Sequence, residues 1–175
     1  MRANPPALGL YLHIPFCKQK CVYCDFYSLP RAESRMDDYT DALCAHLAET
    51  APFAADHLVD TVYFGGGTPS YLGAKRLTKI LKVVLKRFKV AKDAEITLEA
   101  NPDSAGDWKE LRSLRKCGFN RLSLGMQSAD DAELAEIGRV HTMAQVSAAV
   151  EAARKAKFQN LSLDLIYGLP HQTLE

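Results

Sequence analysis

The chain has 175 residues, of which 47% are hydrophobic and 25% charged, and its length and composition fit one globular domain and exclude a disordered or fibrous protein. The formal net charge of +1 gives no overall attraction to nucleic acid or to an anionic membrane, so we expect no nucleic-acid partner. Because no apolar run approaches the roughly 20 residues that cross a bilayer and residues 1–10 lack the layout of a secretory signal, we expect a cytoplasmic protein without a transmembrane segment.

Short apolar runs alternate along the chain with segments of helical periodicity. The expected strands cover residues 8–14, 58–64, 95–100, 121–127 and 160–167. Apolar residues at i, i+3, i+4 and i+7 predict helices over 36–47, 77–88 and 143–153, with a shorter one near 108–114. Repeated strand–helix alternation predicts an α/β fold whose strands are parallel and whose helices are crossovers.

The alternation stops in the middle of a unit. The fifth expected strand leads into Gly168, Leu169 and Pro170, and the chain ends at Glu175 without a fifth helix. We therefore expect residues 1–175 to be one domain whose C-terminal part is missing.

Three of the five cysteines lie within eight positions, in the pattern C-x3-C-x2-C formed by Cys17, Cys21 and Cys24. Three thiolates this close suit a soft metal centre. A structural zinc site normally has four ligands, and the nearest spare candidate, His13, lies on an expected strand. A 4Fe–4S cubane held by three cysteines keeps one iron open for a substrate or cofactor, so we favour this cluster.

Two alternatives to the cluster stay open. The three cysteines could belong to a zinc-bound structural module, or they could be ordinary core residues. Cys44 and Cys117 lie in helical segments, where we expect them to pack in the core.

Polar residues and glycines follow several of the expected strands. Gly65–Pro69 comes directly after the second strand, where glycines either let a ligand approach the backbone or serve a tight turn. Glu99 and Gln127 end the third and fourth strands, and Asp164 lies inside the fifth. Side chains at corresponding ends of parallel strands point into one barrel mouth, where the active sites of such folds lie. Taken singly, each could be a strand-end cap or a surface pair.

Two sets of basic residues have different readings. Arg139 lies past a helix and could bind a carboxylate through two hydrogen bonds. The lysines and arginines of the second helix, between residues 75 and 89, are expected to form a solvated face, because no aromatic platform for nucleic acid accompanies them.

The cysteine motif after a first strand resembles the signature of radical S-adenosylmethionine (SAM) proteins. The run Tyr11–Cys17 is similar to their oxygen-independent coproporphyrinogen III oxidase-like branch, and further matches cover almost the whole chain. The resemblance implies a partial (β/α) barrel of the radical SAM type, here truncated after about five parallel strands. It also implies that a 4Fe–4S cluster and SAM are the cofactors. The positions that match SAM contacts of the family are Tyr11, Tyr23, Gly66, Gly67, Thr68, Glu99, Gln127, Arg139 and Asp164.

Two functions within this branch compete. The oxidases, which carry out an oxidative decarboxylation in porphyrin biosynthesis, place another cysteine two residues after the last cluster ligand, where this chain has Phe26. The sequence Cys24-Asp25-Phe26 resembles the haem chaperones of the HemW type, which bind haem for delivery to acceptor proteins. We therefore favour a haem chaperone, with haem as cargo and with an electron donor protein and a haem acceptor protein as partners. The alternative is an oxidoreductase that acts on coproporphyrinogen.

Overall fold

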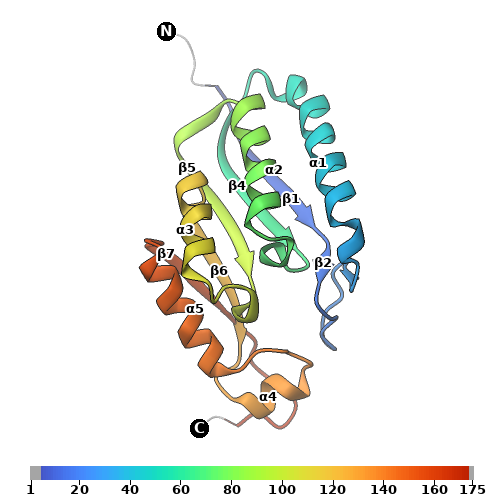
Figure 1. The fold of residues 1–175 in the computed structure, drawn as a ribbon, viewed down its shortest axis with the longest axis vertical. Helices are drawn as coiled ribbons and strands as arrows, with labels where there is room; N and C mark the ends of the chain where they lie inside the picture. Colours follow the sequence, from blue (N-terminus) through green and yellow to red (C-terminus); the bar gives the residue numbers. More distant parts are fainter. Residues whose placement is uncertain (1–4, 174–175) are drawn as a thin grey trace.

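Five parallel strands in sequential order form the main sheet of the computed structural model, which describes residues 5–173 (Figure 1). Its strands are β1 (Ala7–Ile14), β4 (Leu58–Gly66), β5 (Val90–Ala100), β6 (Arg121–Gln127) and β7 (Asn160–Leu165). The crossovers carry α1 (Met36–Thr50), α2 (Ala74–Arg87), α3 (Trp108–Cys117), α4 (Asp131–Glu136) and α5 (Met143–Lys155). The smaller elements are β2 (Phe16–Cys17), β3 (Leu29–Pro30) and four 3₁₀ turns, at Glu33–Arg35, Ala51–Ala54, Pro69–Leu72 and Pro102–Ser104.

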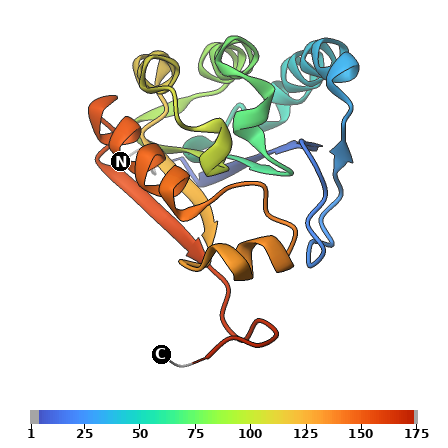
Figure 2. The same ribbon diagram turned by 60° about the horizontal axis from the view of Figure 1, so that its bottom comes forward.

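The helices α1, α2, α3 and α5 lie along one face of the curved sheet (Figure 2). Each strand pairs in parallel with the next, so all five carboxyl ends meet at the same edge of the sheet. One-sided helices on a curved parallel sheet with sequential strand order are the features of an open (β/α) barrel. The predicted partial barrel is therefore confirmed. None of the helices in the described residues is long and apolar enough to span a membrane.

The core lies between the sheet and this helical layer. Four residues of the predicted apolar stripe of α2, Leu77, Ile80, Leu81 and Val84, are fully buried, whereas Leu85 is 42% exposed. Phe64 of β4 and Phe119 before β6 are also fully buried, and their rings meet edge to face at a centroid distance of 4.9 Å. Cys44 and Cys117 are half-buried and pack against this core, as expected.

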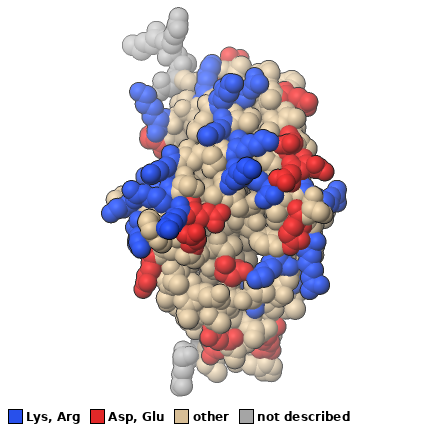
Figure 3. Space-filling model, viewed as in Figure 1, with Lys and Arg blue, Asp and Glu red and all other residues tan. Residues whose placement is uncertain are grey.

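The opposite side of α2 forms the charged surface that the sequence predicted. Arg76 pairs with Asp37 of α1 at 2.7 Å, and Lys79 pairs with Asp41. Figure 3 shows basic side chains mixed with acidic ones over this face of the molecule. The basic run is thus a solvated face that is partly neutralised by α1.

Four strand boundaries differ from the sequence prediction: β1 begins one residue earlier, at Ala7, and β4 continues two residues further, through Gly66. β5 begins at Val90 instead of residue 95, because Val90 already pairs with Val59 before a register shift. β7 ends at Leu165, two residues earlier than expected. The described residues after β7, 166–173, form no helix. The two-residue strands β2 and β3 are too short for any periodicity to reveal them.

The packing of Phe64 gives a test of this core. Phe64→Ala should lower the free energy of unfolding by about 3–5 kcal/mol, because it leaves a cavity beside Phe119. Urea denaturation followed by circular dichroism measures this change. Phe53→Ala is the matched control, because Phe53 is 87% exposed and its loss should change stability by less than about 0.5 kcal/mol. Equal effects of the two substitutions would contradict the described core.

A candidate metal and cofactor site

A cavity of about 300 Å³ lies at the carboxyl ends of the strands. It is lined by all the residues that the sequence proposed for the site except Tyr11, namely Cys17, Cys21, Tyr23, Cys24, Gly66, Gly67, Thr68, Glu99, Gln127, Arg139 and Asp164. These residues come from segments up to about 150 positions apart, so their convergence follows from the parallel pairing and not from sequence proximity.

The three cysteines lie on a loop that is closed at its base by the short ladder of β2 and β3. Phe16 pairs with Leu29 in this ladder, and the N–H of Leu29 donates to the carbonyl of Pro15 at 2.7 Å. The far side of the loop contacts the segment after α4. There the N–H of Val22 donates to Ile137, and the Gln19 amide donates to the carbonyl of Gly138 at 2.8 Å. The loop is therefore fixed at both ends.

The thiols of this loop influence one another. Cys17 is buried, and burial raises the pKa of its thiol. A hydrogen bond from Thr68 lowers that pKa, while the nearby thiols of Cys24 and Cys21 raise it further. Three thiolates in one cavity repel each other unless a cation compensates their charge, so this donor set suits a metal centre.

The thiols of the cysteine loop are not arranged to hold a single metal ion. A zinc ion needs its ligands to converge at about 2.3 Å for each sulfur. Within residues 5–173, no group of three or more Cys, His, Asp or Glu side chains converges on a single ion in this way. The cysteines of a cubane each bind a different iron and stand further apart.

His13, the spare zinc ligand considered from the sequence, is already engaged. Its Nδ1 lies 3.0 Å from the hydroxyl of Tyr11, and its Nε2 lies 3.0 Å from the carbonyl of Tyr27. Both ring nitrogens therefore have partners, which argues against a Cys₃His zinc site.

Gly66, the last residue of β4, and Gly67 after it pack closely against the chain that enters the cysteine loop. A Cβ added at Gly67 would lie 2.8 Å from the backbone oxygens of Pro15 and Phe16. At Gly66, where φ is +119°, it would lie 2.7 Å from the ring of His13. Close packing against the neighbouring chain therefore explains part of the need for glycine at these two positions. Gly66 and Gly67 also line the cavity, where a ligand could approach their backbone.

Glu99 is held by two donors at the end of β5. Its carboxylate accepts from the hydroxyl of Tyr63 at 2.5 Å and from the N–H of Gly66 at 3.1 Å. Burial and then Glu99 raise the pKa of Tyr63 far above its ordinary value. Tyr11 stacks on Tyr63, with ring centroids 6.1 Å apart, so it supports this group from beside the cavity. Sequence reasoning missed Tyr63, although it lies two residues before the glycine loop.

The end of β6 carries a local distortion. The register against β7 shifts between Gly125 and Gln127, and Gln127 has a positive φ of 70°. Bulges are frequent beside active sites, and a left-handed non-glycine residue costs on the order of 1 kcal/mol. Asp164 lies across from this bulge and accepts a hydrogen bond from Ser123 at 3.1 Å. The distortion therefore marks this rim of the cavity as constrained.

Arg139 joins several walls of the cavity. Its guanidinium donates to Asn101 Oδ1 at 2.7 Å, to the carbonyl of Gly125 at 2.8 Å, to the hydroxyl of Tyr23 at 3.4 Å and to Cys21 Sγ at 3.6 Å. Burial raises the pKa of Tyr23 to about 12, and Arg139 acts in the opposite direction. The sequence analysis did not single out Asn101.

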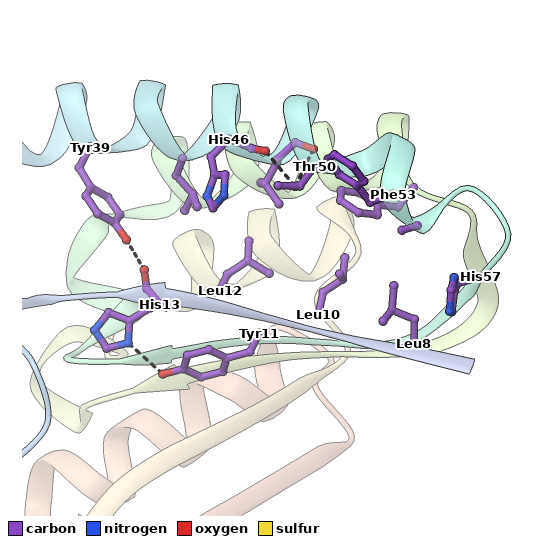
Figure 4. A pocket seen from close by; sticks show the side chains of 14 residues that line it. Leu8, Leu10, Tyr11, Leu12, His13, Tyr39, His46, Thr50, Phe53 and His57 are labelled. Carbon is purple, nitrogen blue, oxygen red and sulfur yellow. Dashed lines mark hydrogen bonds between the residues drawn. The ribbon is translucent and has the colours of Figure 1, made fainter. Parts of the chain in front are cut away.

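A second cavity of about 510 Å³ lies between β1 and α1 (Figure 4). Its walls carry apolar side chains such as Leu8, Leu10 and Leu12, and none of its lining residues is a cysteine or a charged Asp, Glu, Lys or Arg. Figure 4 shows Tyr11 hydrogen-bonded to His13, and Tyr39 donating to the His13 carbonyl, at one end of it. The three cysteines and every proposed SAM contact except Tyr11 line the first cavity, while Tyr11 lines this second one together with the histidines His13, His46 and His57.

Comparison with known proteins finds relatives over nearly the whole chain. The model of the radical SAM superfamily matches residues 11–175. Heme chaperone HemW of Escherichia coli is 39% identical over 97% of this chain, and heme chaperone HemW of Mycobacterium tuberculosis is 43% identical over 94%. The solved structure of coproporphyrinogen III oxidase (HemN) from Escherichia coli covers 97% of this chain with a TM-score of 0.88 and 35% identity. This chain spans 45% and 43% of the two chaperones and 39% of the oxidase.

A glycine-to-alanine substitution tests the contact between the glycine loop, residues 65–69, and the chain that enters the cysteine loop. Gly67→Ala should lower the free energy of unfolding by about 1–3 kcal/mol, because its Cβ meets backbone that cannot turn aside. Urea denaturation measures the effect. Gly106→Ala is the control, because nothing lies within 4 Å of its added Cβ, and its stability should stay within about 0.5 kcal/mol of the wild type. A neutral Gly67→Ala would show that the two loops do not touch as described.

Proposed function

The chain belongs to the radical SAM superfamily, and we propose on this premise that Cys17, Cys21 and Cys24 hold a 4Fe–4S cluster whose fourth iron is open to SAM. The observation that carries the proposal is the single cavity shared by three free cysteines and the glycine loop. The family supplies the identity of the two cofactors. The chemistry that a reduced cluster supplies to bound SAM is one-electron reduction of its sulfonium, which breaks a carbon–sulfur bond.

The residues around the cysteines have distinct roles in this proposal. Gly66, Gly67 and Thr68 present their backbone to the amino-acid end of SAM, while the Thr68 hydroxyl is directed at Cys17. Glu99, fixed by Tyr63 and Gly66, gives that end of the cavity a carboxylate. The remaining proposed SAM contacts are Tyr11, Tyr23, Gln127, Arg139 and Asp164. Tyr11 is the one that lies outside the cavity lining, so its contribution would be through Tyr63 and Glu99.

Haem delivery is the function that we propose for the whole protein, with haem as cargo, a haem acceptor protein and an electron donor protein as partners, in the cytoplasm. Two relatives at 39% and 43% identity are heme chaperones by name. Phe26, where the oxidases have a cysteine, lines the cavity and is 69% exposed. The site of this chain therefore lacks the thiol that the oxidases have at this position.

Coproporphyrinogen oxidation is the second candidate. The structural similarity to the oxidase HemN, at 35% identity and a TM-score of 0.88, favours it. The fold that the two functions share does not distinguish them, so the decision rests on what the protein binds and converts.

Replacement of one cluster ligand tests the cofactor assignment. Anaerobically reconstituted wild-type protein should contain about four iron and four sulfide per chain, by the stoichiometry of the cubane. Cys21→Ala should lose the cluster while circular dichroism shows that most of the fold remains, because the loop is peripheral to the core. Cys117→Ala should retain the iron, since Cys117 lies on α3 against the core. A colourless wild-type protein that holds one zinc ion would overturn the assignment.

A direct comparison of cargo and substrate tests the choice between the two functions. The full-length protein should bind haem in a visible-absorption titration and should release no carbon dioxide from coproporphyrinogen in the presence of SAM and a reductant. Stoichiometric release of carbon dioxide from that substrate would establish the oxidase instead.

A further inference from the structure

Four side-chain hydrogen bonds connect Cys17 to Cys21 across the cavity wall. Thr68 Oγ1 donates to Cys17 Sγ at 3.7 Å, and Asn101 Nδ2 donates to Thr68 Oγ1 at 3.1 Å. On the other side, Arg139 Nη2 donates to Asn101 Oδ1 at 2.7 Å and Arg139 Nη1 donates to Cys21 Sγ at 3.6 Å. Asn101 is the centre of this relay, although it touches neither sulfur.

The direction of the relay is fixed by Arg139. A guanidinium can only donate, so the side-chain oxygen of Asn101 faces it and the amide NH₂ faces Thr68. The Thr68 oxygen then accepts from Asn101, which leaves its hydroxyl hydrogen to point at Cys17. An amide is the side chain that accepts at one end and donates at the other in this manner.

The backbone of Asn101 is held in place independently of its side chain. Its carbonyl accepts from the N–H and the hydroxyl of Ser104, each at 3.0 Å, and its N–H donates to Ser70 Oγ at 3.4 Å. The amide is therefore presented from a fixed turn at the end of β5, and Gln, one methylene longer, would not meet both partners.

We propose that Asn101 is a positioning residue that aims the donors of Thr68 and Arg139 at two of the three cluster cysteines and so raises the reduction potential of the bound cluster. This inference rests on the proposed function, because it presupposes a cluster on Cys17 and Cys21. Hydrogen bonds to cysteine sulfurs stabilise the extra electron of a reduced iron–sulfur cluster and are one of the means by which proteins set its potential.

Two substitutions of Asn101 separate the relay from a simple change of charge. Asn101→Leu has a similar shape and no polar atoms, so it releases both Thr68 and Arg139. Asn101→Asp still accepts from Arg139, but a carboxylate cannot donate and draws the Thr68 hydroxyl hydrogen away from Cys17. Because Asn101→Asp keeps the Arg139 bond, we expect it to retain the cluster.

The readout is the midpoint potential of the reconstituted protein, obtained by a redox titration followed by electron paramagnetic resonance. Both variants should have a more negative potential than the wild type, with about a tenfold change in the equilibrium constant of reduction, which is about 59 mV for one electron. Iron content and circular dichroism, measured alongside, show that each variant is folded and loaded.

Asn120→Asp is the matched control. Asn120 also bridges backbone groups, since its side chain accepts from the N–H of Ile96 at 2.7 Å and donates to the carbonyl of Ala94 at 2.8 Å. It lies before β6, at the amino end of the strands, so its substitution can cost stability but should leave the potential unchanged.

The possible outcomes distinguish this inference from the proposed function. A wild-type protein that assembles no cluster refutes the proposed function. If the wild type assembles a cluster and both Asn101→Leu and Asn101→Asp have the same midpoint potential as the wild type, the relay is refuted and the proposed function is not. A shift in Asn101→Asp without one in Asn101→Leu would show that charge, and not hydrogen bonding, is responsible, and would also overturn the inference.

Discussion

The parallel pairing of five strands in chain order is the constraint on which the rest of the structure depends. Parallel strands all end at the same edge, so the glycine loop after β4, Glu99 of β5, Gln127 of β6 and Asp164 of β7 are brought to one rim. The helices on one face supply the apolar burial that stabilises this sheet. The cavity is thus a property of the topology, and the identity of the residues at the strand ends decides its chemistry.

Much of this arrangement was predictable from the sequence because it depends on periodicity and on strand ends. The stripe of α2 and the limits of β6 follow directly from the pattern of apolar residues. The same reasoning placed Glu99, Gln127 and Asp164 at one barrel mouth, since side chains at the carboxyl ends of parallel strands meet at one edge of the sheet. The resemblance of Tyr11–Cys17 to a known family then supplied the cofactors.

The parts that were missed depend on contacts between segments distant in sequence. Nothing in the immediate surroundings of Asn101 shows that its amide will meet both Thr68 and Arg139, which lie 33 and 38 positions away. In the sequence, Tyr63 is indistinguishable from any other aromatic residue of a strand. Its role depends on the pairing of β4 with β5, which brings Glu99 within hydrogen-bond distance of its hydroxyl. The early start of β5 likewise depends on Val59, its partner in the neighbouring strand. Pairing partners of this kind are fixed by the fold and leave no local signature.

The docking of the cysteine loop on Ile137 and Gly138 has a consequence for the order of events during biosynthesis. The cysteines of this loop are synthesised early. Ile137 and Gly138, which hold the far side of the loop, are synthesised more than a hundred residues later. At roughly 5–20 residues per second, a nascent chain spends on the order of 6–23 seconds with its thiols exposed and unbraced. Assembly of the proposed cluster in the fixed loop therefore has to follow translation of α4 and of Ile137 and Gly138 after it.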